Sequence, residues 1–221
     1  MTRTDDAFRF RTVVFDLDAV LVDSFAVTRE AFTRAARDIV GEGDPPFAEH
    51  RSHQGRHFPD VMRREGLPGA LEKPFAEAGH RLIDRVTVYP GVPPLLETLR
   101  DAGIRTAVAT GTSGIRARAV LDAVGLLPLL GTVVGSDEVP RPKPWPDIVR
   151  EALDRLASPP ATALLVGDAV LDIRSGRAAG TATAGATWGE GAVGALRAAA
   201  PDFLLDHPVE LLPLVSGVSA R

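Results

Sequence analysis

Two pairs of aspartates are the residues of this sequence best suited to chemistry. Asp16 and Asp18, in VVFDLDAVLVDS, follow a short apolar run, and the alternation of side chains along a strand places both carboxylates on one side. Asp168 follows another apolar run in LLVGDAVLD, and Asp172 comes one helical turn later. If both runs end side by side, the carboxylates converge as hard oxygen ligands for magnesium (Mg2+). The alternatives are a chance acidic turn for the first pair and a dipole-favoured helix N-terminal acid for Asp172.

Two further segments carry groups that bind an oxyanion. The hydroxyl of Thr110 and the backbone amides around Gly111 follow the apolar run in AVATGTSG. Lys143 stands in RPKPWPD, between prolines that stiffen its approach. Short hydroxyl residues are also common in turns, and a single lysine can be a solvated loop charge. Near three carboxylates and a phosphate, this lysine would instead offset negative charge.

The elements that must position these residues follow from the hydrophobic pattern. Five short runs rich in Val, Ala and Leu predict buried strands, and stretches with helical spacing lie between most of them. This alternation predicts an α/β fold, a parallel sheet with helices on both faces. Ligands of such sheets bind beyond the carboxyl ends of the strands. The predicted strands are residues 12–15, 105–109, 132–134, 163–166 and 181–186.

The interval from residue 24 to residue 88 breaks this rhythm. It has helical patterns and turns but no convincing strand, and it is too long for a plain crossover. We therefore expect an inserted helical unit in residues 24–88 and a core formed by residues 1–23 and 89–221. The C-terminal segment PDFLLDHPVELLPLV predicts one late strand and a helix. The helices expected in the insertion are near residues 25–40, 58–65 and 71–86.

Composition excludes several classes of protein. The 221 residues include 25 basic and 29 acidic side chains, a formal charge of −4, so no basic field attracts nucleic acid or an anionic membrane. The absence of cysteine excludes disulfides, thiolate metal sites and cysteine nucleophiles. Asp5 and Asp6 precede any apolar run, unlike in a signal peptide, and no run approaches the roughly 18 apolar residues of a membrane span. We expect a cytoplasmic protein, a monomer or weak dimer.

Four motifs in this order resemble those of the haloacid dehalogenase (HAD) superfamily of phosphotransferases, over nearly the whole chain. DLDAVLVDS, residues 16–24, resembles D-x-D-G-[TV]-L-x-D-S. The second motif ends at Thr110, the third is Lys143, and GDAVLD, residues 167–172, is similar to the fourth. The resemblance implies a Rossmann-like core with a small all-α cap of the C1 type, inserted after the first strand.

The resemblance also implies a role for each aspartate of the first motif. Asp16 would be the nucleophile that accepts the phosphoryl group as an aspartyl phosphate, which divides one difficult displacement into two easier ones. Asp18 would be the acid/base that protonates the leaving alkoxide and then deprotonates the attacking water. An acid at position 18 disfavours a dehalogenase. Hydrolysis of a phosphonate by a cap lysine is also disfavoured, because Lys73 is the only lysine of the expected cap.

The remaining motif residues would hold the metal and the phosphate. By resemblance, Mg2+ is held by the Asp16 carboxylate, the Asp18 carbonyl and Asp168, and Asp172 completes or orients that shell. Phosphate binding falls to the other motifs. Thr110, Gly111 and Lys143 would grip the transferring oxygens, where fixed donors and positive charge contribute most.

One residue departs from the family pattern. The family glycine after Asp18 is Ala19 here, where backbone amides normally approach the phosphate. If this position needs a positive φ, alanine costs about 1 kcal/mol. We still expect an active enzyme. The alternative is a catalytically impaired protein that binds a phosphorylated ligand.

The substrate is expected to be a small-molecule phosphate ester. In C1-capped members a loop between cap helices reads the leaving group, and the candidate residues are Gln54, Gly55 and Arg56, with a solvated linker as the alternative. The narrower resemblance is to phosphatases associated with 3-amino-5-hydroxybenzoate (AHBA) synthesis in antibiotic pathways. It implies a sugar or aminosugar phosphate. Phosphoglycolate hydrolysis and a phosphosugar mutase remain alternatives.

Overall fold

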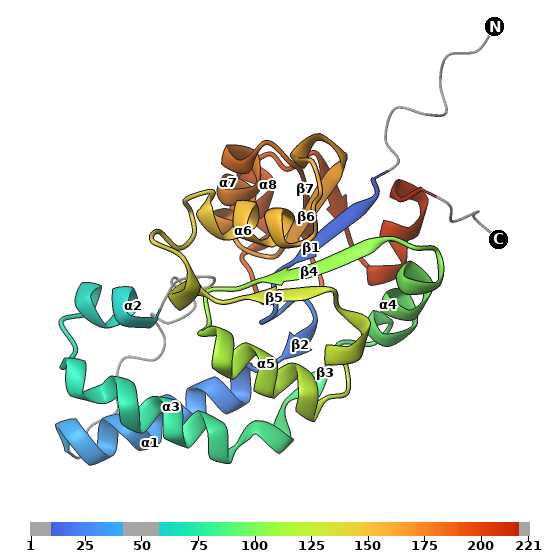
Figure 1. Cartoon of the computed structure of the whole chain (residues 1–221). Coiled ribbons are helices and arrows are strands. Elements are labelled where there is room, and N and C mark those ends of the chain that lie inside the picture. The colour runs from blue at the N-terminus through green and yellow to red at the C-terminus, as the bar shows by residue number, and fades with distance from the viewer. Residues whose placement is uncertain (1–9, 42–57, 217–221) are drawn as a thin grey trace, which may run out of the picture.

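A six-stranded parallel sheet forms the centre of the molecule (Figure 1). The computed structural model describes residues 10–41 and 58–216. The strand order is β5-β4-β1-β6-β7-β8, and all neighbouring pairs run parallel. The predicted α/β class is therefore confirmed. The strands are β1 (Thr12–Phe15), β4 (Arg105–Ala109), β5 (Thr132–Val134), β6 (Ala163–Gly167), β7 (Ala182–Ala186) and β8 (Phe203–Leu205).

The three central strands end at the same level. Phe15, the last residue of β1, pairs with Val108 on β4 and with Val166 on β6. Every residue of β1 and β6 is buried. Such burial is expected of strands covered on both faces, and it explains why each reads as an unbroken apolar run. The residues that follow these strands consequently lie together at one edge of the sheet.

Helices cover both faces of the sheet, as predicted. The side chains of Val13 and Phe15 pack with α4 and α5, whereas that of Val14 packs with α6 on the opposite face. α7 lies against α6, and α8 contacts α7. Gly180 caps the C-terminus of α7 with a φ of 87°. The helices are α4 (Val92–Asp101), α5 (Gly114–Ala123), α6 (Asp147–Arg155), α7 (Val170–Ala179) and α8 (Val193–Ala198).

Within its described residues, the predicted insertion (residues 24–88, called the cap below) contains three helices. They gather to one side of the sheet in Figure 1, and α1 packs along α3. Phe58 on α2 stacks on Phe75 of α3, with ring centroids 3.9 Å apart, and Phe32 of α1 meets both rings edge-on. The helices are α1 (Phe25–Val40), α2 (Phe58–Arg64) and α3 (Glu72–Arg81).

The helix predicted over residues 71–86 is shorter than expected. α3 ends at Arg81, and Leu82 leaves the helical region with a ψ of 7°. The chain then tightens into a 3-10 turn, η3 (Ile83–Arg85), in which Arg85 N–H donates to Leu82 O at 3.0 Å. The apolar spacing continues through this turn, so the pattern gave no sign of the break.

Two very short strands join the cap to the core. β2 (Val22–Asp23) and β3 (Thr87–Val88) form an antiparallel pair in which Val22 faces Val88. The sequence predicts no strand in residues 24–88, and β3 corrects that expectation: two residues are too few for a period to be detected. The division into core and cap at residues 23/24 and 88/89 stays a prediction. Across the described part of the chain, no helix is long and apolar enough to span a membrane.

Candidate active site

The register of the sheet brings the two acidic pairs together. Asp16 and Asp168 directly follow the adjacent strands β1 and β6, and both side chains are buried. Asp172 stands in the first turn of α7 and is fully buried. One carboxylate oxygen from each of these three residues lies within 4.8 Å of the others. The sequence predicts that these carboxylates converge if the two strands end side by side. The strands do end side by side, and the carboxylates converge.

Lys143 completes this cluster. Its Nζ lies 2.9 Å from Asp16 Oδ1 and 2.5 Å from Asp172 Oδ1, and the side chain is fully buried. Its loop is fixed nearby, because Ser175 of α7 donates a hydrogen bond to Trp145 O at 2.7 Å. Lys143 is therefore not a solvated loop charge. Asp172 also accepts a hydrogen bond from the backbone N–H of Ala169 at 3.0 Å. Its position in the first turn of α7 is the one that the helix dipole favours for an acid, so that alternative is compatible with its place in the cluster.

The cluster carries more negative charge than one lysine offsets. Burial raises the pKa of Asp16 to about 7, although Lys143 acts in the opposite direction. Burial also raises the pKa of Asp168 well above its usual range, and the carboxylates of Asp172 and Asp16 add to this rise. Burial alone would lower the pKa of Lys143, but the two adjacent carboxylates raise it above its ordinary value. A buried set of hard oxygen donors with excess negative charge fits a divalent cation such as Mg2+.

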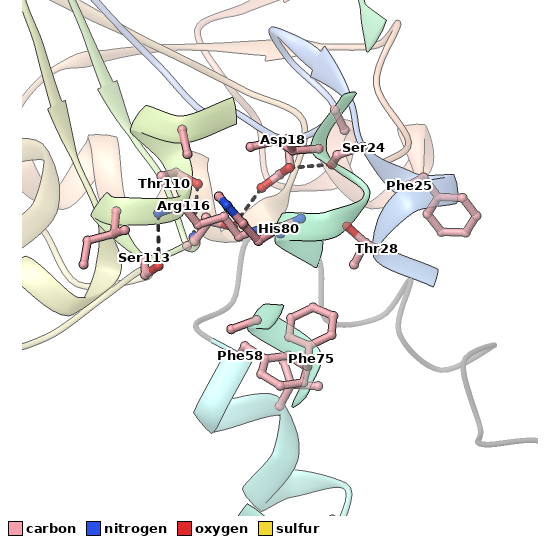
Figure 2. A pocket seen from close by; sticks show the side chains of 18 of the residues that line it. Asp18, Ser24, Phe25, Thr28, Phe58, Phe75, His80, Thr110, Ser113 and Arg116 are labelled. Atoms are coloured by element: carbon pink, nitrogen blue, oxygen red, sulfur yellow. Dashed lines mark hydrogen bonds between the residues drawn. The ribbon is translucent and has the colours of Figure 1, made fainter. Parts of the chain in front are cut away.

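Asp18 stands apart from the charge cluster. Its Oδ1 accepts a hydrogen bond from Ser24 Oγ at 2.5 Å, and its Oδ2 accepts one from Thr112 Oγ1 at 3.0 Å. Ser24 precedes α1 of the cap, whereas Thr112 belongs to the loop between β4 and α5. Figure 2 shows the first of these contacts. The sequence analysis assigned neither hydroxyl to Asp18, although both lie inside the quoted motifs.

Ala19 occupies a backbone conformation that favours glycine. Its φ is 63°, and its N–H donates to Val22 O at 2.8 Å. The backbone at position 19 therefore does have a positive φ, and the strain that this imposes on alanine is about 1 kcal/mol. The turn nevertheless forms, and it places Asp18 between its two hydroxyl donors.

The loop after β4 presents Thr110 and Gly111 to a cavity. Thr110 is buried, and its Oγ1 accepts a hydrogen bond from the N–H of Thr112 at 3.1 Å. Gly111 O accepts a hydrogen bond from Ser136 Oγ at 2.7 Å. These hydrogen bonds are typical of a turn, and the same turn leaves Thr110 and Gly111 on the cavity wall. A role in the turn is therefore compatible with a role in oxyanion binding.

A cavity of about 660 Å³ lies between the sheet edge and the cap. Asp16, Asp18 and Asp168 line it from the core, and Phe58 and Phe75 line it from the cap. Figure 2 shows Asp18 and the two phenylalanine rings. The cavity thus joins a charged end to an apolar wall. The predicted substrate residues Gln54, Gly55 and Arg56 lie outside the described residues.

Arg116 and His80 also line the cavity, and the sequence analysis did not select them. Arg116 comes from the first turn of α5, and His80 comes from α3. Neither belongs to a motif, and the sequence contains many arginines on amphipathic helices. No local signal distinguishes Arg116 from the rest.

Comparison with known proteins identifies the family of the chain. The family model for haloacid dehalogenase-like hydrolases matches residues 10–180. The chain belongs to this family. The haloacid dehalogenase-like fold is further supported by a solved hydrolase from Pseudomonas syringae, which is 26% identical with a TM-score of 0.79, covering 91% of this chain and 95% of that one. The expectation of an enzyme of this superfamily is confirmed.

Two curated relatives of this haloacid dehalogenase-like hydrolase extend over most of the chain. "Probable phosphatase IndB" of Dickeya dadantii is 33% identical, covering 88% of each protein. A phosphoglycolate phosphatase of Aquifex aeolicus is 29% identical, covering 93% of this chain and 96% of the relative.

Proposed function

We propose that this haloacid dehalogenase-like hydrolase is a Mg2+-dependent phosphatase that hydrolyses a small phosphomonoester through an aspartyl phosphate. The observation that carries the proposal is the buried cluster of Asp16, Lys143, Asp168 and Asp172 at the inner end of a ligand-sized cavity. The names of the two relatives give further support.

Asp16 is the proposed nucleophile. Its Oδ1 accepts hydrogen bonds from Leu17 N–H at 2.8 Å and lies 2.9 Å from Lys143 Nζ, which fixes the carboxylate plane. The other oxygen is then the one that attacks phosphorus: an Asp16–phosphorus bond forms as the bond to the leaving oxygen breaks. Lys143, Thr110 and Gly111 stabilise the oxygens of the transferring group.

Asp18 is the proposed acid/base. It gives its proton to the leaving oxygen, and in the second step it takes a proton from the water that attacks the aspartyl phosphate. The hydroxyls of Ser24 and Thr112 hold both oxygens of this carboxylate, so its orientation does not depend on the substrate.

The metal site is proposed from the donor set. The carboxylates of Asp16 and Asp168, with the backbone carbonyl of Asp18, would hold Mg2+. The bound cation would neutralise the negative charge shared by nucleophile and phosphate. Asp172 orients Lys143 through their 2.5 Å contact and thereby keeps the lysine beside the nucleophile.

Phosphate release from a panel of phosphomonoesters tests the proposal. The panel contains phosphoglycolate, sugar phosphates, aminosugar phosphates, nucleotides and p-nitrophenyl phosphate, each with Mg2+ and with EDTA. We expect release that requires Mg2+. Preference for an aminosugar phosphate would support the AHBA-type pathway, preference for phosphoglycolate would support that alternative, and an isomerised sugar phosphate would indicate a mutase. No release from any ester would contradict a phosphatase.

A further inference from the structure

Arg116 is a cationic side chain of the cavity wall, and one of its guanidinium nitrogens has no hydrogen-bond partner in the described part of the chain. Its Nη1 is buried and has no hydrogen-bond partner within residues 10–41 and 58–216. Burial lowers the pKa of this guanidinium, and the charge of Asp18 opposes the effect. A buried donor without a partner is costly, more so when it carries a charge. This arrangement therefore favours a ligand that supplies an acceptor.

The guanidinium reaches across from the core to the cap. A Cβ added to Gly79 of α3 would lie 2.1 Å from Arg116 Nη1, so the arginine fills the space that a side chain at position 79 would occupy. The core helix α5 also contacts η3 of the cap. Arg116 is thus enclosed only where α3 lies against α5, and the cost of its unpaired Nη1 arises in this arrangement.

Asp18 does not satisfy Arg116. No hydrogen bond joins Asp18 to Arg116 Nη1, and the hydrogen bonds that the Asp18 oxygens accept come from the hydroxyls of Ser24 and Thr112. Asp18 nevertheless marks the side of the cavity from which the leaving group departs, because the proposed acid/base must reach the leaving oxygen. Figure 2 shows Asp18, Arg116 and His80 at the same end of the cavity, with Phe58 and Phe75 at the other.

We propose that Arg116 binds an oxyanion on the leaving group of the substrate, a carboxylate or a second phosphate, and that this contact stabilises the cap against the core. The inference rests on the proposed phosphatase function and narrows its substrate class. An oxyanion pairs with the planar guanidinium and removes the cost of enclosing it. A substrate without an oxyanion leaves Arg116 Nη1 buried and unpaired, so the closed arrangement of cap and core favours substrates that carry one.

Two of the acidic residues that line the cavity, Glu72 and Glu77, are exposed on α3, so solvent screens their repulsion of an anionic substrate. Arg81, a second cavity arginine, is also exposed. It offers a matched control, because it carries the same charge and lines the same cavity but is more exposed than Arg116.

The test compares kcat/KM for esters that differ only in the second anion. One arm pairs phosphoglycolate with 2-hydroxyethyl phosphate, and the other pairs glucose 1,6-bisphosphate with glucose 1-phosphate. We expect the wild type to prefer the member with the second anionic group in at least one pair, and that pair identifies the group as a carboxylate or a phosphate. Arg116→Gln should reduce that preference by about 10- to 100-fold, the loss typical of a hydrogen bond between charged groups, mainly through KM. Arg116→Lys should restore part of it.

Gly79→Ala provides a variant that keeps the arginine. Its methyl group displaces the guanidinium, so it should lower the same preference, while alanine favours the helix and protects the fold. It carries the test if Arg116→Gln fails to fold. Arg81→Gln should change the preference by less than about 3-fold, as expected for an exposed charge.

Three results would overturn the inference. The first is an Arg116→Gln variant that loses the same factor in kcat/KM on both members of each pair. The second is an Arg81→Gln variant that loses as much of the preference as Arg116→Gln does. The third is a wild type that prefers a cationic aminosugar phosphate and whose preference does not change on substitution of Arg116. Failure of the wild type to hydrolyse even p-nitrophenyl phosphate would instead contradict the proposed phosphatase itself.

Discussion

The sheet edge and the cap enclose the same cavity but are built in different ways. At the sheet edge, strand register alone places Asp16 and Asp168 side by side, and each carboxylate has a fixed partner in Lys143 or in the backbone. The cap instead contributes stacked rings and a helix whose Gly79 admits a side chain from the core. Backbone register thus places the carboxylates of the sheet edge, whereas the contact of Arg116 with Gly79 depends on side-chain fit between the core and the cap.

Asp16→Asn is the change with the largest expected effect, and it tests the sheet-edge half of this comparison. The amide cannot act as the nucleophile, so phosphate release should fall by about four orders of magnitude, the scale seen when a catalytic group is removed. Its size is unchanged, and Asp172 still pairs with Lys143, so the fold should persist. Stopped assays with each ester and a thermal melt measure the two quantities. Retained turnover would exclude the aspartyl phosphate.

Without Mg2+, the free energy of unfolding should depend on pH, because the carboxylates clustered at the sheet edge repel one another when they ionise. Without Mg2+, the folded pKa of Asp16 is raised from 3.8 to about 7. A group whose pKa is higher in the folded state stabilises the fold fully at pH values below its unfolded pKa. That stabilisation is lost as the pH rises through its folded pKa. The free energy of unfolding in EDTA should therefore fall by roughly 1–4 kcal/mol between pH 4 and pH 8.

Thermal melts across this pH range, with EDTA and with Mg2+, measure the effect. Mg2+ should remove most of the loss at pH 8, because the cation neutralises the ionised carboxylates. An Asp16→Asn and Asp168→Asn double variant is the control, and its stability should vary less with pH. A wild-type protein in EDTA that becomes more stable from pH 4 to pH 8 would contradict the assigned cluster.

Asp18 offers the most direct comparison of the two regions, since each supplies one hydroxyl to it. Ser24→Ala removes the donor at the start of the cap, and Thr112→Val removes the donor from the core. Each should lower kcat by about 10- to 100-fold, because a hydrogen bond to a charged group is lost. Thr112→Ser keeps the hydroxyl and should retain most activity. A loss confined to Thr112→Val would mean that the cap donor has no part in positioning Asp18.

The predictability of the fold follows the same division. The strands and the aspartates after them could be predicted, because a buried parallel strand leaves an apolar run and its last residue fixes the site. The break at Leu82, the two-residue strand β3 and the enclosure of Arg116 against Gly79 could not. The pairing of β3 with β2 and the contact of Arg116 with Gly79 join segments far apart in sequence, and the apolar spacing continues through the break at Leu82. Residues 54–56, expected to read the leaving group, lie outside the described part of the chain.

Ala19→Gly should have the smallest effect, and it tests whether the sheet edge is catalytically impaired. Glycine relieves the strain of a φ of 63°, but it also gains freedom in the unfolded chain, so the net stabilisation should be about 0.5 kcal/mol. Because Asp18 already has both hydroxyl partners in the alanine protein, kcat should change by less than about 3-fold, a difference of under 1 kcal/mol. A thermal melt and the preferred ester measure both. A gain of orders of magnitude would instead mean that Ala19 holds the natural protein in an inactive, ligand-binding state.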